Sequence, residues 1–152
     1  QLHGLIEEHV MPYVDSVFMA KWVAGRSAWL KASDKERQEF VDTFMDLLIS
    51  SYGNTLVIFK DKNLNFKIAN RSSRSSKNVQ VLCTVTEKDK EPIRVIYQMK
   101  RVGDTWKSFD MVMEGISLLK GLKAQFSDDI QNQGLVGVTK KIQAHQYKLR
   151  EG

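Results

Sequence analysis

The chain has 152 residues, of which 42% are hydrophobic and 27% are charged. This length and composition are typical of one folded domain, so we expect a single domain over residues 1–152. Nine glycines and two prolines exclude collagen-like and low-complexity sequence. No apolar run approaches the ~20 residues that a membrane-spanning helix requires.

The net charge of +5 is concentrated in two segments. Residues 60–77 carry six basic side chains and one acidic one, and residues 138–152 carry four and one. Such segments could meet nucleic acid, anionic lipid head groups or an acidic protein surface, or could simply be solvated. The segment from Arg71 to Lys77 contains no aromatic residue on which bases could stack, so we do not expect nucleic-acid binding.

The cysteine content and the start of the chain bear on the cellular compartment. A single cysteine, Cys83, excludes an internal disulfide framework and a multi-cysteine metal site. The chain begins with Gln1 and shows no signal-peptide pattern, which we interpret as a processed or trimmed form. Both forms fit a secreted protein.

The first part of the chain follows helical spacing. Apolar residues recur at this spacing from Leu2 to Trp22, and Gly25 predicts a stop or kink. The sequence Ser33–Glu36 is a capping box, which predicts the start of a long helix. A further helical segment is expected around Tyr52, with Gly53 as a weak point near its start.

From about residue 64 the apolar period changes from helical to two. Alternation over 64–69, 79–86, 93–100 and 106–113 predicts four strands, and short polar turns favour a meander. After Gly115 the pattern is helical again, with Gly134 as a C-cap and a last helix over about 137–149. The expected fold class is therefore α+β: N-terminal helices, a four-stranded antiparallel sheet, and C-terminal helices that cover one sheet face.

Candidate catalytic and metal-binding groups are few. The histidines His3, His9 and His145 have no partner at metal-ligand spacing, so we expect no metal site. Cys83 lies among valines on a strand, where an inert buried thiol is expected. Neither a G-x-S-x-G motif nor a P-loop is present. We therefore expect no enzymatic activity and no cofactor.

Large flexible apolar side chains are plentiful around the fourth strand and the helix after it, and include Met111, Met113 and Leu122. They could form ordinary core or wall a cavity for an apolar ligand, because methionine adapts to ligands of variable shape.

Two stretches of sequence resemble the MlaC family, also called Ttg2-type or toluene-tolerance proteins. The first is Trp22–Ser33 with Phe44–Tyr52. The second is Val95–Met99, Gly103–Lys107 and Glu114–Ser117, in the order strand, turn, strand and helix. The resemblance covers about residues 6–142.

This resemblance implies a periplasmic phospholipid-binding protein that carries lipid between an outer-membrane lipoprotein complex and an inner-membrane ABC transporter complex, and so maintains outer-membrane lipid asymmetry. It implies an NTF2-like sheet joined to a helical part, with acyl chains in an apolar cavity between them. It also implies a monomer whose only ligand is phospholipid. The alternative is a small-apolar-ligand-binding or isomerase-like domain of similar cone-shaped fold, which would place a titratable group in the apolar pocket.

We expect the cavity to be lined by apolar side chains from three parts of the chain. The helical wall comprises Phe44, Leu47, Leu48, Tyr52, Leu56 and Phe59; the sheet contributes Val81, Cys83, Val95, Tyr97, Met99, Met111 and Met113; and Leu119, Leu122 and Phe126 form a lid.

Overall fold

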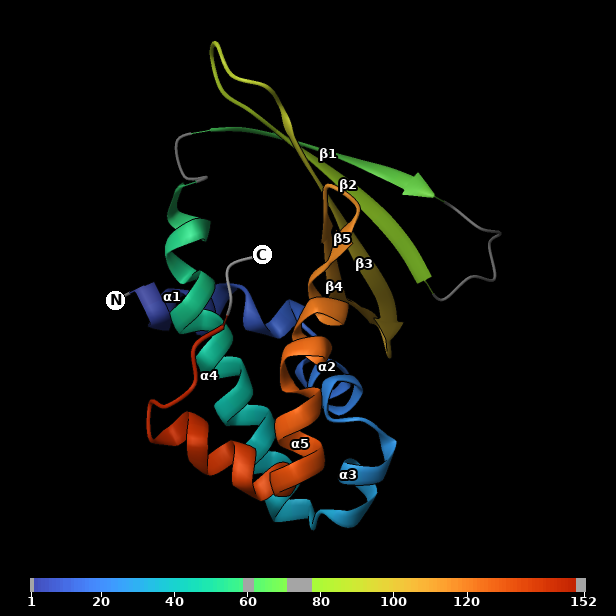
Figure 1. Ribbon diagram of the computed structural model, residues 1–152. Helices are drawn as coiled ribbons and strands as arrows, with labels where there is room; N and C mark the ends of the chain where they lie inside the picture. Colours follow the sequence, from blue (N-terminus) through green and yellow to red (C-terminus); the bar gives the residue numbers. More distant parts are fainter. Residues whose placement is uncertain (1, 59–61, 71–77, 150–152) are drawn as a thin grey trace. The chain divides into compact units, whose positions relative to one another are not determined.

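A computed structural model describes residues 2–58, 62–70 and 78–149 (Figure 1). The chain divides into two compact units, each assembled from two stretches of sequence. Residues 1–15 and 52–118 form what we call the sheet unit, and residues 16–51 and 119–152 form the helical unit. The single domain expected over residues 1–152 stays a prediction.

The sheet unit contains five antiparallel strands in the order β1-β2-β3-β4-β5, so the predicted meander is confirmed (Figure 1). The strands are β1 (Asn63–Asn70), β2 (Asn78–Thr86), β3 (Ile93–Val102), β4 (Thr105–Met113) and β5 (Ile116–Ser117). The prediction of four strands omitted β5, because a strand of two residues is too short to show a period of two. The basic segment 71–77 lies outside the described residues.

A short N-terminal region packs on β4 within the same unit. It consists of α1 (Leu2–His9) and the 3₁₀ helix η1 (Met11–Tyr13). The backbone N–H of Asp15 donates to the carbonyl of Ser108 at 2.9 Å, and Lys100 Nζ lies 2.8 Å from the Asp15 carboxylate. These contacts attach the N-terminal segment to β4 through Ser108 and to β3 through Lys100.

The helical unit is built from α2 (Ser16–Ala24), α3 (Arg26–Lys31), most of α4 (Asp34–Ile58) and most of α5 (Leu118–Gln143). The predicted capping box is confirmed: the Ser33 N–H donates to Glu36 Oε1 at 2.8 Å, and the Glu36 N–H donates to Ser33 Oγ at 3.2 Å. The further helical segment expected around Tyr52 is the end of α4 and not a separate helix, since α4 continues through Gly53 to Ile58. Gly53 is buried within this helix.

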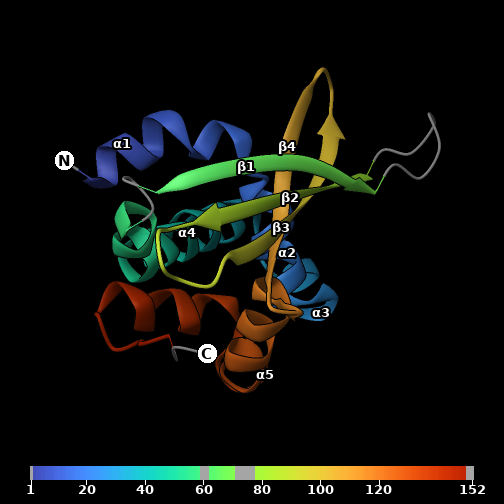
Figure 2. The ribbon, with the colours of Figure 1, turned by 90° about the horizontal axis from the view of Figure 1, so that it is seen from above.

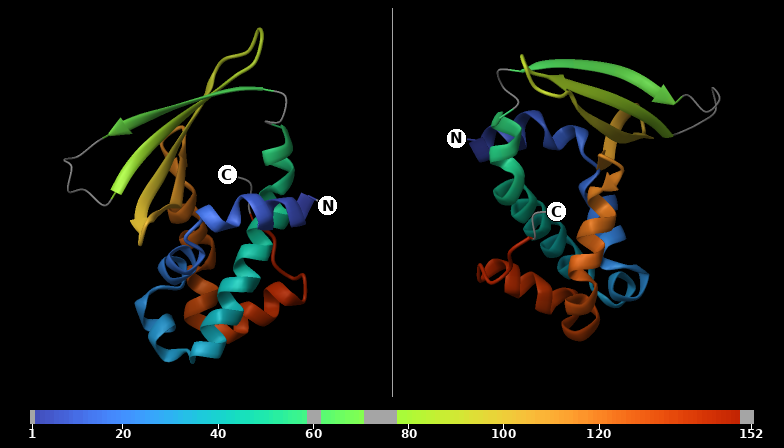
Figure 3. Two further views of the ribbon diagram at one scale, coloured as in Figure 1. Left: turned by 180° about the vertical axis from the view of Figure 1, so that it is seen from behind. Right: turned by 45° about the horizontal axis from the view of Figure 1, so that its top comes forward.

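Two glycines interrupt the helices of this unit as predicted. Gly25 has φ +83° between α2 and α3. Gly134 has φ +70° and ψ 177° within α5, which changes direction there (Figure 3). Left-handed φ angles of this kind favour glycine because any Cβ would be strained.

The predicted end of the last helix, at about Leu149, is wrong: α5 ends at Gln143. The following segment returns over the helix, because the Tyr147 ring stacks on Phe126 with centroids 4.5 Å apart and its hydroxyl donates to the Gln125 carbonyl at 2.9 Å. Helical spacing in the sequence cannot anticipate this contact, because Tyr147 lies beyond the end of α5 and reaches a residue in the first part of that helix. In the described part of the chain, no helix has both the length and the hydropathy needed to span a membrane.

Candidate functional site

The sheet unit places most of the predicted sheet residues on one face. In the β2–β3 register, Val81 lies opposite Tyr97 and Cys83 lies opposite Val95. The β3–β4 register continues the row, since Tyr97 faces Met111 and Val95 faces Met113. Directly opposite residues point to the same side of a sheet, so these side chains form one apolar surface across three strands, which we call the apolar face.

The centre of the apolar face is well covered. Cys83 and Val95 are each 3% exposed and pack with Val85 in one cluster. Tyr97, Met111 and Met113 are partly buried around that cluster. Met99, the remaining predicted sheet residue, lies opposite Val79 and is also partly buried. A register shift between Gln98 and Met99 separates it from the regular pairing of β3 with β4.

The apolar face extends onto β1, the edge strand of the sheet (Figure 2), where its side chains are exposed. Phe66 lies opposite Cys83, and Leu64 and Ile68 lie opposite Val85 and Val81. Phe66 is 60% exposed, and Leu64 and Ile68 are 47% exposed. Their alternation predicted a strand, but these three residues are not among the predicted site residues. The signal that could have included them is their period-two alternation, which matches that of the apolar residues on β2.

Burial changes the titration of the two polar groups on this face. Burial raises the pKa of the Cys83 thiol. It also raises the pKa of the Tyr97 phenol, with a further contribution from Cys83 once that thiol ionises in alkali. Both groups are therefore neutral at physiological pH. Within the described residues, no group of three or more His, Cys, Asp and Glu side chains could hold a metal ion.

The predicted helical residues are distributed over both units. Phe44 is fully buried in the helical unit, where its ring lies 5.7 Å from that of Phe40 and 5.6 Å from that of Phe126. Tyr147, which is not among the predicted site residues, adds a fourth ring to this cluster. Leu48, Leu119 and Leu122 are also buried in this unit, and Leu47 is partly buried.

Three predicted residues of the helical wall lie at the end of α4 or beyond it. Tyr52 is partly buried and belongs to the sheet unit. Leu56 lies within α4, but its side chain is outside the described set, and Phe59 lies outside the described residues.

The junction from β4 into α5 is held by a carboxylate. Asp110 Oδ1 accepts the N–H of Met111 at 2.8 Å, and Asp110 Oδ2 accepts the Ser117 hydroxyl at 2.5 Å. This pair connects β4 to the residue that immediately precedes α5, and so it orients the strand that carries Met111 and Met113.

Comparison with known proteins identifies relatives of the chain. The sequence model of the family described as MlaC protein matches residues 1–144. The toluene tolerance protein ttg2D of Pseudomonas putida is 26% identical over 123 residues, which are 81% of this chain and 56% of that protein. The intermembrane phospholipid transport system binding protein MlaC of Haemophilus influenzae is 21% identical over 145 residues, 93% of this chain and 67% of that protein.

A solved structure is also similar to this chain. The phospholipid-binding protein from Ralstonia solanacearum, in complex with a phospholipid, matches with a TM-score of 0.82 and 25% identity, over 94% of this chain and 79% of that one. The chain spans 56% of the length of the Pseudomonas relative.

Proposed function

The chain belongs to the MlaC family, and on this premise we propose that it is a periplasmic phospholipid-binding protein. In this proposal it carries lipid between an outer-membrane lipoprotein complex and an inner-membrane ABC transporter complex, and so maintains outer-membrane lipid asymmetry. The names of the relatives from Haemophilus and Ralstonia, which refer to phospholipid transport and phospholipid binding, support this assignment.

The observation that carries the proposal is the apolar face of the sheet unit. It runs from the buried cluster at Cys83 and Val95 to the open side chains of Phe66, Leu64 and Ile68 on β1. Contiguous exposed apolar surface marks an interaction site. Aliphatic, aromatic and methionine side chains side by side suit a flexible acyl chain.

The energetics of lipid transfer require such a surface. Each CH₂ group gains about 0.8 kcal/mol on leaving water, so an acyl chain of about 16 carbons gains roughly 12 kcal/mol when it is covered. Removing two chains from a bilayer into water is therefore prohibitively slow without a carrier. A carrier needs an apolar site that is available before binding, and it needs no acid, base or nucleophile.

The predicted lining residues keep their roles within this proposal. The sheet residues contact acyl chains directly, and the helical residues remain predicted lining residues. The head group remains near solvent, which avoids the cost of burying its charge. Phospholipid is the only ligand in the proposal, which includes no metal, cofactor or catalytic step.

Extraction of the purified protein with organic solvent, followed by mass spectrometry, tests the proposal. We expect phospholipid in stoichiometric amounts, and reloading from phospholipid vesicles after the protein has been stripped. Absence of phospholipid from several preparations, together with no uptake from vesicles, would falsify the carrier function.

A charge placed on β1 tests whether the apolar face is the site. Phe66→Glu puts a carboxylate where an acyl chain would lie, and since Phe66 is 60% exposed the change should cost little stability. We expect a severalfold loss of bound phospholipid per folded molecule. Asn65→Glu is the matched control, because Asn65 is exposed on the opposite face of the same strand and pairs with Thr84. Equal loss in both variants would show that the apolar face is not the binding surface.

A further inference from the structure

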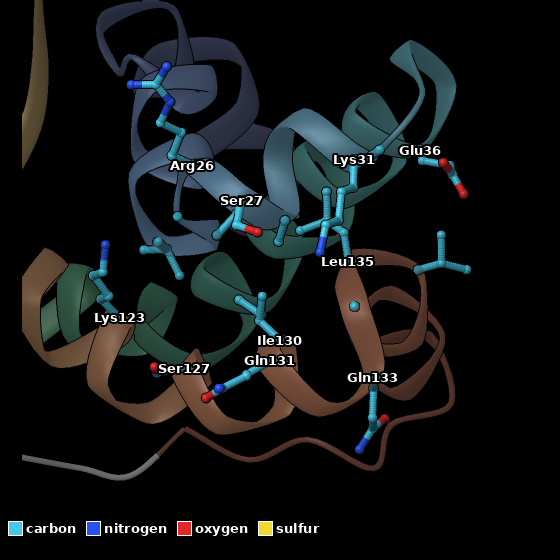
Figure 4. A pocket seen from close by; sticks show the side chains of 17 residues that line it. Arg26, Ser27, Lys31, Glu36, Lys123, Ser127, Ile130, Gln131, Gln133 and Leu135 are labelled. Atoms are coloured by element: carbon cyan, nitrogen blue, oxygen red, sulfur yellow. The ribbon is translucent and has the colours of Figure 1, made fainter.

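The helical unit contains a groove that none of the predicted lining residues touches (Figure 4). It consists of two clefts of about 760 Å³ and 500 Å³, which share Gly25, Arg26 and Lys123 as lining residues. Figure 4 shows Arg26 and Lys123 at one end of the larger cleft and Glu36 at the other. We call the two clefts together the Gly25 groove.

Both breaks in the helices of this unit lie on the Gly25 groove. Gly25 ends α2 and Gly134 interrupts α5, and both residues line the larger cleft. A Cβ built on either glycine would meet nothing within 4 Å, so the space beside them is open. Glycine is therefore required at these positions by the positive φ angles of the backbone and not by a lack of space. These angles change the direction of the chain at the two positions that line the groove.

The charge of the groove is strongly one-sided. Its basic side chains are Lys21, Arg26, Lys31 and Lys123. Its acidic side chain, Glu36, is already engaged by Ser33 in the capping box. Among the described residues, Lys21, Arg26 and Lys31 form no ion pair. The groove thus presents cations whose charge the described part of the protein does not neutralise.

Large apolar side chains lie beside these cations. Phe18, Trp22 and Trp29 line the smaller cleft, together with Leu30, which is 60% exposed. Lys123 Nζ donates to the Trp22 carbonyl at 3.2 Å and lies 4.6 Å from the centroid of the Trp22 ring, which fixes one cation against the aromatic wall. A ligand that matches the groove therefore needs both negative charge and apolar groups.

We propose that the Gly25 groove docks an acidic peptide segment with apolar side chains, carried by a partner protein. The inference rests on the proposed function, because a protein that carries lipid between two membrane complexes must bind partner proteins. Clefts of about 300–1,000 Å³ accept a few side chains, whereas the flat surface of a bilayer does not enter a recess. Unneutralised cations would attract the acidic segment, and Leu30 and the tryptophans would bind its apolar residues.

Fluorescence anisotropy with labelled twelve-residue peptides tests the proposal. The probes are a panel of peptides that combine Asp and Glu with Leu and Phe in different registers, and in the control panel Asn and Gln replace the acids. We expect saturable binding of the acidic peptides that weakens with added salt, and at least about tenfold weaker binding of the controls.

Variants locate the binding on the groove. Lys21→Glu with Arg26→Glu reverses two exposed cations of the groove and should weaken acidic-peptide binding at least about tenfold. Lys35→Glu with Lys140→Glu is the matched control, because both residues are exposed in the same unit and neither lines the groove. The control has the same net charge and should bind within about twofold of the wild type.

Two results with the peptides would overturn the inference. One is a panel in which no acidic peptide binds more tightly than its neutral counterpart. The other is equal loss of binding in the groove and control variants, which would indicate a general charge effect. Flotation with phosphatidylglycerol vesicles adds a third, since vesicle binding that depends on Lys21 and Arg26 in the absence of peptide binding would assign the groove to a membrane. Phospholipid content, measured in the same samples, reports separately on the proposed function.

Discussion

The apolar face depends on residues that stay neutral. Cys83 and Tyr97 are the polar groups within it, and burial raises the pKa of both. A raised pKa in the folded state means that stability is fully present below the ordinary pKa and is lost as the pH rises through the folded value. The face is therefore uncharged at neutral pH and becomes unfavourable only in alkali.

Thiol reactivity measures this neutrality directly. Because the thiolate is the reactive form and Cys83 is 3% exposed, N-ethylmaleimide should react with the folded protein at pH 7.5 at least about tenfold more slowly than with the unfolded protein. Phospholipid loading should slow the reaction further if acyl chains cover the face. The protein in guanidinium chloride is the control, and equal rates in the folded and unfolded states would contradict the prediction.

The capping carboxylate of Glu36 makes the stability of the folded state depend on pH in the acid range. The Ser33 N–H and hydroxyl hold the pKa of Glu36 below its ordinary value of 4.5. A carboxyl group whose pKa is lowered by folding stabilises the folded state at pH values above its ordinary pKa. This stabilisation is lost as the pH falls through the lowered pKa. Glu36→Gln should therefore lower the melting temperature at pH 7, and the difference from the wild type should shrink below about pH 4. A difference that is constant from pH 7 to pH 3 would show that the charge of Glu36 contributes nothing.

At the scale of elements, glycine interrupts the helices at two positions and lies within a continuous helix at others. Gly25 and Gly134 have left-handed φ angles, whereas Gly53 and Gly121 lie within continuous helix. The difference lies in the backbone, since Gly25 and Gly134 have positive φ angles that favour glycine, whereas Gly53 and Gly121 do not.

Substitution of two glycines within α5 separates these roles. Gly134→Ala forces a Cβ into a backbone conformation that is essentially limited to glycine, and should destabilise the protein by about 1–3 kcal/mol in urea unfolding. Gly121→Ala, where nothing lies within 4 Å of the added Cβ, should be neutral or stabilising by up to about 1 kcal/mol. Similar effects at both positions would mean that Gly134 is not required for the break.

At the scale of the whole molecule, two units are built from interleaved stretches of one chain. Helix α4 begins in the helical unit and ends in the sheet unit. Helix α5 begins at Leu118, the last residue of the sheet unit, and continues in the helical unit. Each unit therefore depends on the correct folding of distant segments, and a local fragment of sequence does not contain either unit.

A tryptophan in each unit distinguishes ligand space from packed core. If Val95 faces acyl chains, Val95→Trp should remove bound phospholipid while the lipid-free protein melts close to the wild type. Val138→Trp is the control, because Val138 is fully buried in the helical unit and should show the overpacking cost of about 1–3 kcal/mol with unchanged lipid per folded molecule. A marked loss of stability in lipid-free Val95→Trp, with phospholipid retained, would place Val95 in the core and leave β1 as the remaining candidate surface.

The sequence alone determined the features that depend on neighbouring residues. Period-two alternation predicted β1 to β4, the Ser33–Glu36 spacing predicted the capping box, and Gly25 and Gly134 predicted the two breaks. The same alternation placed Cys83, Val95 and Met113 on one face, as the strand register confirms. These rules work because a helix turn or a strand pleat relates residues only a few positions apart.

Only the tertiary structure decided where distant segments meet. The return of Tyr147 onto Phe126, the burial of Gly53 and the short strand β5 have no local signal. The same holds for the Gly25 groove, where Lys123 contacts Trp22 from 101 positions away. Contacts of this kind arise from packing among elements that are already formed, and side-chain periodicity along the chain carries no information about which elements will pack together.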